Sequence, residues 1–120
     1  MTWLSIFLGG GLGSVCRFGI SKLIPYTGGF PWATIIANLF ACLILGFMLG
    51  NSKSTEWSDD YRLMIMTGFC GGLSTFSTFS AETYTLIQEG SMLIAGGYIL
   101  MSIIACLIGI FLGYQIAKYV

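Results

Sequence analysis

Four long apolar runs, separated by short polar or glycine-containing segments, make up almost the whole chain. They extend over about residues 3–24, 32–50, 61–89 and 91–118. Because the hydrocarbon core of a bilayer is about 30 Å thick, a helix that crosses it needs roughly 20 apolar residues. The pattern therefore predicts four transmembrane helices, with both chain ends on one side of the membrane.

The ends of these runs carry residues typical of a membrane boundary. Prolines and glycines in residues 25–31 predict a turn after the first run, and the most polar stretch, residues 51–60, predicts an exposed loop after the second. Amphipathic rings prefer the membrane interface, and several lie near the predicted ends: Trp3, Tyr26, Trp32, Trp57, Tyr61 and Tyr119. The N-terminus has neither a basic stretch nor a small-residue cleavage site, so the first run is expected to remain as a span.

The third run contains an interruption that a uniform lipid-facing helix would not carry. Gly68, Gly71 and Gly72 are followed by hydroxyl residues throughout 74–80. Glycine lowers helix propensity, and serine and threonine offer the backbone alternative hydrogen bonds. The sequence therefore predicts a break near residues 71–78. Its carbonyl groups can coordinate a cation, and its amides and hydroxyls can face an anion.

Composition supports a membrane protein and excludes several other classes. Of the 120 residues, 56% are apolar and 8% charged, and the mean hydropathy is +0.87. The expected fold class is all-α and integral to the membrane, as a single domain over residues 1–120. Five basic and five acidic residues give no net charge, so nucleic acid is not an expected partner. The cysteines lack CxxC spacing and there is no histidine, which removes the ligands of zinc and haem sites.

Small residues recur at helical spacing in every run. They include Gly9 and Gly13, Ala33, Ala37 and Ala41, Gly46 and Gly50, Gly68 and Gly72, and Ala105, Gly109 and Gly113. This spacing predicts close helix packing, because small side chains let backbones approach one another. The general frequency of glycine in membrane helices is the alternative explanation.

The basic residues show almost no bias between the two predicted sides. Lys53, Arg62 and Lys118 fall on the side of the chain ends, and Arg17 and Lys22 fall on the other. Since the asymmetry of lysine and arginine sets orientation, a chain this balanced is expected to insert both ways and to pair as an antiparallel, dual-topology homodimer. A single orientation set by a subtler signal is the alternative.

Candidate binding chemistry gathers at and after the interruption. Phe76 and Phe79 lie on neighbouring parts of one face if that segment is helical. Aromatic ring edges carry partial positive charge. Two phenylalanines beside the hydroxyls of Ser77 and Thr78 can therefore line an anion path without any formal charge. Ordinary packing of core phenylalanines is the alternative.

Polar residues in the other runs extend this candidate path. Asn38 lies midway along the second run, where an unpaired amide would be costly, so it is expected to face a partner or a pore. Tyr98, Ser102 and Cys106 recur every four residues on the fourth run and form a weakly polar stripe. Such a stripe can orient hydroxyl groups toward a pore, and hydrogen bonds between packed helices explain it equally well.

The charged residues point away from catalysis. Arg17 lies within about two turns of its helix end, where its side chain can reach a vestibule or lipid headgroups. Glu82 and Glu89 are expected at the solvated interface. No pair of nucleophile and base, metal cluster or phosphate-binding loop is visible in the sequence, so the chain is not expected to be an enzyme.

These segments resemble the CrcB or Fluc family of microbial fluoride channels from Gly9 to the end of the fourth run. The motifs are GGGLGSVCRF at 9–18, ATIIANLFA at 33–41, GFCGGLSTFSTF at 68–79 and the spacing of Tyr98 and Ser102. The third motif is the most distinctive. Departures from the common family pattern are mild: Ser74 in place of threonine, Ala33 and Ala41 in place of glycine, and Cys106 where serine is frequent.

The resemblance implies a dual-topology homodimer in membrane lipid, with two antiparallel pores for fluoride. It implies pore positions for Asn38, Phe76, Phe79, Ser77, Thr78, Tyr98 and Ser102, and a vestibule or structural position for Arg17. It also implies a structural sodium ion (Na+) at the dimer centre, held by main-chain oxygens of Gly71 and Ser74 from both subunits. The implied activity is passive export of cytoplasmic fluoride across the inner membrane of a bacterial cell.

Two other functional classes are less well supported by the residues. A small, dual-topology, proton-coupled multidrug exporter would need a buried carboxylate, typically in its first helix, and the first run contains none. A purely structural accessory subunit would leave the interrupted third helix without a purpose.

Fluoride holds its water shell tightly, so a fluoride pore needs many hydrogen-bond donors at close range. Without a lysine or arginine in the middle of the pore, binding stays weak enough for the ion to be released.

Overall fold

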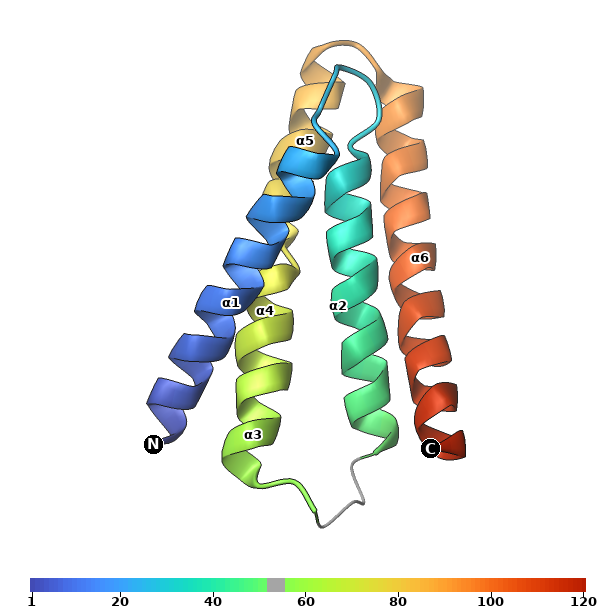
Figure 1. Cartoon of the computed structure of the whole chain (residues 1–120). Helices are drawn as coiled ribbons and strands as arrows, with labels where there is room; N and C mark the ends of the chain where they lie inside the picture. Colours follow the sequence, from blue (N-terminus) through green and yellow to red (C-terminus); the bar gives the residue numbers. More distant parts are fainter. Residues whose placement is uncertain (52–55) are drawn as a thin grey trace.

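The computed structural model describes residues 1–51 and 56–120, and most of them are helical (Figure 1). Three helices are long and apolar enough to cross a membrane: α1 (Thr2–Leu23), α2 (Trp32–Gly50) and α6 (Met92–Tyr119). The chain between α2 and α6 forms shorter pieces: α3 (Asp59–Leu63), the π-helix η1 (Met64–Cys70), α4 (Gly71–Leu73) and α5 (Phe76–Gln88). No strand occurs in the described residues, which agrees with the predicted all-α class.

The segment that the sequence assigns to the third span, about 61–89, is divided in the structure. Its first part, α3 to α4, contains the wider π-helical turns of η1, a geometry that is rare and often found at functional sites. Its second part, α5, starts after Ser74 and Thr75 and ends at Gln88. Among the described residues, none of these pieces has by itself the length of a membrane span.

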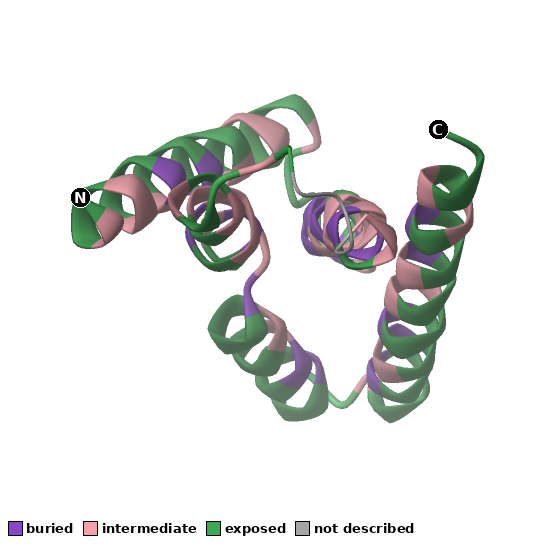
Figure 2. Cartoon of the chain, turned by 90° about the horizontal axis from the view of Figure 1, so that it is seen from below, coloured by how far each residue is buried: buried purple, intermediate pink, exposed green. Residues whose placement is uncertain are grey.

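Helix α2 occupies the centre of the fold and packs against α1, η1, α4 and α6. Its buried side chains join two clusters, one toward α5 and α6 and one toward η1 and α4. The first contains Ile35, Leu86, Ala95 and Tyr98, and the second contains Ala37, Ala41, Cys70 and Leu73. In Figure 2, α1 and α6 present broad exposed faces to the outside. These faces are apolar, as lipid or a protein partner would require.

The backbones of α2 and α6 are in close contact, and α6 is the most extensive neighbour of α2. Gly113 of α6 lies against the backbone of Leu43, and Gly46 of α2 lies against the backbone of Ile110, so that a Cβ atom on either glycine would overlap the opposite chain. The predicted small-residue packing is therefore confirmed for this helix pair.

A second close contact joins α1 to η1 and α4. Gly9 lies against the backbone of Met64, and Gly72 lies against the backbone of Gly10, again without room for a Cβ atom. Small residues from both sides thus place the first helix directly against the segment that precedes the break.

Both chain ends, the end of α2 and the start of α3 lie at one end of the molecule, and the connections from α1 to α2 and from α5 to α6 lie at the opposite end (Figure 1). Arg62 and Lys118 share the first end, and Arg17 and Lys22 lie toward the second. Lys53, which the sequence places with Arg62, lies outside the described residues. The arrangement is that of a chain that passes an even number of times between two sides.

Candidate functional site

The polypeptide between α4 and α5 consists of Ser74 and Thr75, whose backbone angles are extended (φ −76°, ψ 155° and φ −153°, ψ 118°). Asn38 of α2 binds the backbone of Thr75 with both ends of its amide. The N–H of Thr75 donates to Asn38 Oδ1 at 2.8 Å, and Asn38 Nδ2 donates to the carbonyl oxygen of Thr75 at 3.4 Å. An open backbone in an apolar setting needs such partners, and here a neighbouring helix supplies them.

Thr75 also begins α5. Its Oγ1 accepts a hydrogen bond from the N–H of Thr78 at 3.2 Å and lies 3.2 Å from the hydroxyl of Ser77. This is an N-cap, which satisfies one of the free N–H groups at a helix start. On the other side of the break, the Ser74 hydroxyl donates to the carbonyl oxygen of Cys70 at 2.7 Å. Both polar side chains therefore stabilise the helix ends that they adjoin.

The same hydrogen bonds remove the helical donors of two carbonyl groups. In a continuous helix the N–H of Thr75 would donate to the oxygen of Gly71, and the N–H of Thr78 would donate to that of Ser74. Here those N–H groups donate to Asn38 Oδ1 and to Thr75 Oγ1. The main-chain oxygens of Gly71 and Ser74 thus lose their usual partners, as carbonyl groups at a helix end do.

An open groove of about 340 Å³, hereafter the Asn38 groove, lies beside the break. Its lining comes from α2, the break, α5 and α6: Asn38, Cys42, Ser74, Thr75, Phe76, Phe79, Ser102, Ile103 and Cys106. The rings of Phe76 and Phe79 are tilted by 38° with their centroids 5.7 Å apart. The hydroxyl of Ser102 is buried and has no hydrogen-bond partner among the described residues. No charged residue occurs in this lining, which combines weak donors with two aromatic rings.

The carboxylate of Glu82 accepts hydrogen bonds from two other helices, and the side chain is half-buried. The hydroxyl of Thr34 on α2 donates to its Oε1 at 2.7 Å, and the hydroxyl of Tyr98 on α6 donates to its Oε2 at 2.8 Å. Tyr98 is completely buried. The sequence did not indicate these two partners, because composition places a carboxylate on α5 without its neighbours, and the solvated position of Glu82 stays a prediction. Glu89, near the end of the same segment, is exposed.

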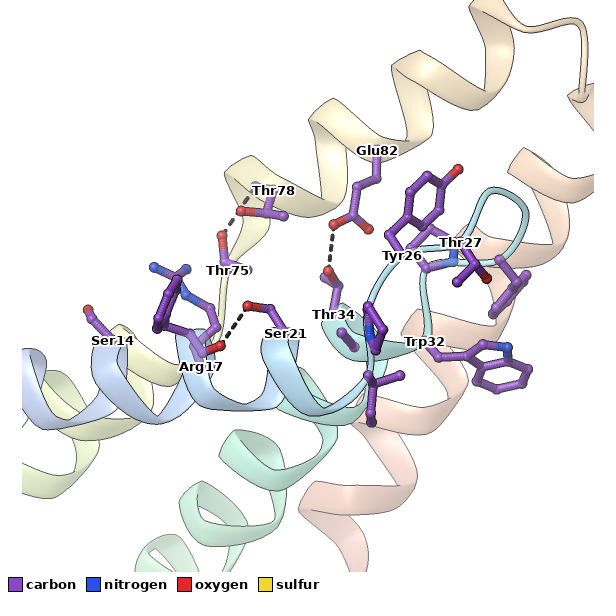
Figure 3. Close-up of a pocket in the computed structure, with 16 residues that line it drawn as sticks. Ser14, Arg17, Ser21, Tyr26, Thr27, Trp32, Thr34, Thr75, Thr78 and Glu82 are labelled. Atoms are coloured by element: carbon purple, nitrogen blue, oxygen red, sulfur yellow. Dashed lines mark hydrogen bonds between the residues drawn. The ribbon is translucent and has the colours of Figure 1, made fainter.

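A second cavity, hereafter the Arg17 pocket, has a volume of about 410 Å³ and lies on the α1 side of the break (Figure 3). Its polar lining includes Ser14, Arg17, Ser21, Tyr26, Thr27, Thr34, Thr75, Thr78 and Glu82. Arg17 is half-buried and projects from α1 toward Thr75 and Thr78. A cationic and an anionic side chain therefore line this pocket, whereas the lining of the Asn38 groove is uncharged.

The predicted pore residues fall in three places. The Asn38 groove contains four of them: Asn38, Phe76, Phe79 and Ser102. Ser77 and Thr78 are exposed and line a third cavity, of about 380 Å³, together with Glu82. Tyr98 lies behind Phe79, with 5.1 Å between ring centroids, and its hydroxyl is committed to Glu82. The predicted set is thus brought near the break without forming one continuous lining in a single chain.

Two residues of this region escaped the sequence reasoning. The sequence did not distinguish Thr75 from the other hydroxyl residues in 74–80, although a threonine directly before a helical segment is a known N-cap signal. Thr34 lies one turn before Asn38 on the same face of α2, and that spacing was the available indication. Neither signal identifies a partner, because the bonds to Asn38 and Glu82 join segments far apart in the sequence.

Comparison with known proteins identifies the family. The family model described as CrcB-like protein, Camphor Resistance (CrcB), matches residues 4–114. A relative from Pyrococcus abyssi, named fluoride-specific ion channel FluC, is 41% identical over 118 residues, which cover 98% of this chain and 96% of the relative. Relatives of the same name from Methanococcus maripaludis and Methanocaldococcus jannaschii are 43% and 42% identical, and they match 92% and 95% of this chain over 90% and 92% of their own lengths. Since these matches include α1, the break and most of α6, the chain belongs to the CrcB family.

Proposed function

We propose that this chain is a fluoride-selective ion channel and that the Asn38 groove forms its anion path. The observation that carries the proposal is the lining of the groove. Asn38 gives one N–H to Thr75 and keeps a second for an anion, the Ser102 hydroxyl has no protein partner, and two phenylalanine rings lie beside them. Weak donors of this kind replace part of an anion's water shell and still allow release. The family is one of ion channels, not of enzymes.

Conduction through this path is passive. A membrane potential that is negative inside drives an anion outward with about 2.3 kcal/mol per charge and 100 mV. Fluoride that entered a cell as the neutral acid would therefore leave through an open pore without ATP or a coupled proton. The chain is a multi-pass membrane protein, and its relatives include archaeal channels, so the bacterial inner membrane remains a prediction.

The functional unit proposed is an antiparallel homodimer. In the single chain the Asn38 groove is open along one side, and Phe76, which borders it, is 79% exposed. Phe76 is an exposed aromatic residue beside donors that would replace part of the water shell of an ion, and such a surface favours cover by a second subunit. Two copies in opposite orientation would complete two equivalent grooves. They would also bring two breaks close together, in agreement with the balanced basic residues.

A structural sodium ion fits the break in such a dimer. Hard cations prefer oxygen ligands, and the carbonyl oxygens of Gly71 and Ser74 have lost their helical donors, as the bonds of Thr75 and Thr78 require. Gly71 is also exposed, with open space at its Cβ position. Sodium bound there would neutralise the negative ends of the two helical segments that precede the breaks.

We further propose that η1, α4 and α5 together complete the fourth crossing of the membrane. The stretch from α3 to α4 runs alongside α1, and α5 continues toward the opposite end of the molecule (Figure 1). Non-helical backbone at membrane depth is tolerated where protein satisfies it, and Asn38 does so for Thr75.

Fluoride efflux from liposomes that contain only this protein tests the proposal. Vesicles loaded with potassium fluoride are diluted into fluoride-free buffer, valinomycin is added, and a fluoride electrode records release. We expect fluoride release that depends on the protein, and chloride-loaded vesicles should release far less anion. Well-folded protein that releases neither anion, or both equally, would contradict a fluoride-selective channel. Proton flux that strictly accompanies fluoride would instead favour a coupled carrier.

A further inference from the structure

Two cysteines line the Asn38 groove, one from α2 and one from α6. Cys42 and Cys106 are both half-buried. The helices are close at this level, since a Cβ atom on Gly109 would lie 3.3 Å from that of Cys42. Each thiol lies four residues, about one turn, beyond Asn38 or Ser102 on its own helix. The pair therefore lies next to the donors of the proposed anion path.

We propose that Cys42 and Cys106 form a two-coordinate site for a thiophilic divalent cation of the mercury(II) type, and that a bound cation closes the Asn38 groove to anions. Sulfur ligands select soft metals. Zinc would need about four ligands, and no group of three or more histidine, cysteine, aspartate or glutamate residues occurs in the described parts of the chain. Two thiols from neighbouring helices instead suit a metal that prefers two collinear sulfur ligands.

Charge balance favours a divalent ion over a monovalent one. Each metal–sulfur bond displaces one proton from a thiol, so one mercury(II) ion and two thiols give a neutral dithiolate and release two protons to solvent. A neutral product suits the apolar surroundings, where a net charge is costly. A monovalent soft ion bound to two thiolates would leave one negative charge beside Asn38 and Ser102.

The remaining cysteines provide internal controls. Cys16 is exposed on α1 and lies outside the groove, and Cys70 is buried in the packed cluster with Ala37, Ala41 and Leu73. Neither lines the Asn38 groove. A single thiol binds mercury(II) through one bond only, so the paired site is distinguished by its requirement for both sulfur atoms.

Thiol counting on the purified full-length protein tests the site independently of transport. The protein is titrated with mercuric chloride, the free thiols are labelled with a maleimide, and mass spectrometry identifies the labelled cysteines. We expect the first equivalent per chain to protect Cys42 and Cys106 together. Cys42→Ala and Cys106→Ala should each bind about a hundredfold more weakly, because the second linked ligand is lost, whereas Cys16→Ser should bind as the parent does. Equal apparent affinity in the parent and both single variants would overturn the paired site.

Fluoride efflux then tests the closure, which rests on the proposed function. One equivalent of mercuric chloride should abolish most efflux of the parent and of Cys16→Ser, and a small dithiol should restore it. Inhibition of each variant is expressed relative to its own flux without metal. Full protection of both thiols with unchanged efflux would overturn the closure. A parent protein without any fluoride flux would contradict the channel, while the thiol counts would still decide the site.

Discussion

Asn38 illustrates how far a single residue can be interpreted before its neighbours are known. Its place midway along an apolar helix indicates that the amide needs a partner, and the structure gives it the backbone of Thr75. The sequence could not name that partner, because residues 38 and 75 meet only through tertiary packing. Glu82 is a second case, in which composition indicated no partner and two hydroxyl groups from other helices bind the carboxylate.

Replacement of Asn38 by alanine should destabilise the break. The change leaves the N–H of Thr75, a buried residue, without its acceptor, and such a group costs about 1–3 kcal/mol. We expect a lower midpoint of thermal unfolding in detergent and reduced fluoride efflux. Asn51→Ala, at the far end of the same helix, is the control and should change stability by less than about 0.5 kcal/mol. Equal stability of the two variants would show that the amide bonds are dispensable.

The ring edges of Phe76 and Phe79 provide a second prediction at this scale. Phe76→Ile and Phe79→Ile keep apolar bulk but remove the partially positive edge, whose worth is about 1 kcal/mol. Each variant should therefore lower fluoride efflux by about tenfold or less per ring while the protein remains folded. Phe111→Ile, on the exposed face of α6, should conduct as the parent does. Undiminished efflux in both ring variants would remove aromatic edges from the mechanism.

At the scale of helices, the periodic features of the sequence were the most predictable. Apolar runs predicted α1, α2 and α6 to within one or two residues, and the glycine spacing predicted close helix packing without naming the helix pairs that glycine contacts join, such as α2 with α6. The π-helical turns of η1 were not predicted, because no amino-acid composition distinguishes the wider hydrogen bonding of a π-helix from that of an α-helix. Ser74 and Thr75 lie inside the broader interval predicted for the break. The sequence could not narrow that interval, because glycines precede and hydroxyl residues follow the one residue, Thr75, whose backbone Asn38 binds.

Gly113→Ala should separate α2 from α6. A methyl group at this position would overlap the backbone of Leu43, and such overpacking typically costs 1–3 kcal/mol. Gly97→Ala, on the same helix with open space at its Cβ position, is the matched control and should leave stability equal or slightly higher. The midpoints of thermal unfolding of the two variants give the comparison. A Gly113 variant as stable as the Gly97 variant would contradict the close packing.

At the scale of the whole molecule, the two ends of the bundle differ little in charge. Both termini lie at one end, with Arg62 and Lys118, and Arg17 and Lys22 lie toward the other. The exposed faces of α1 and α6 are apolar over much of their length. These features support antiparallel association of two subunits. The single chain shows which faces are exposed, and the faces that would meet in a dimer follow only from a structure with both subunits.

Accessibility of the C-terminus in cell membranes tests the two orientations. If insertion is dual, an epitope placed after Val120 should be digested by an external protease in about half of the molecules, because nothing in the lysine and arginine distribution favours one side. Adding three lysines before the epitope should move that end to the cytoplasmic side. Complete protection or complete digestion of the parent chain would contradict dual insertion and the antiparallel dimer with it.

The bonds between Asn38 and Thr75 also bear on how the proposed anion path would work over time. They join the break to a separate, centrally packed helix, so the open backbone exists before any ion arrives and needs no ordering when one does. In the proposed channel, each ion would meet a backbone that is already open, so the break itself would add no waiting step between one ion and the next.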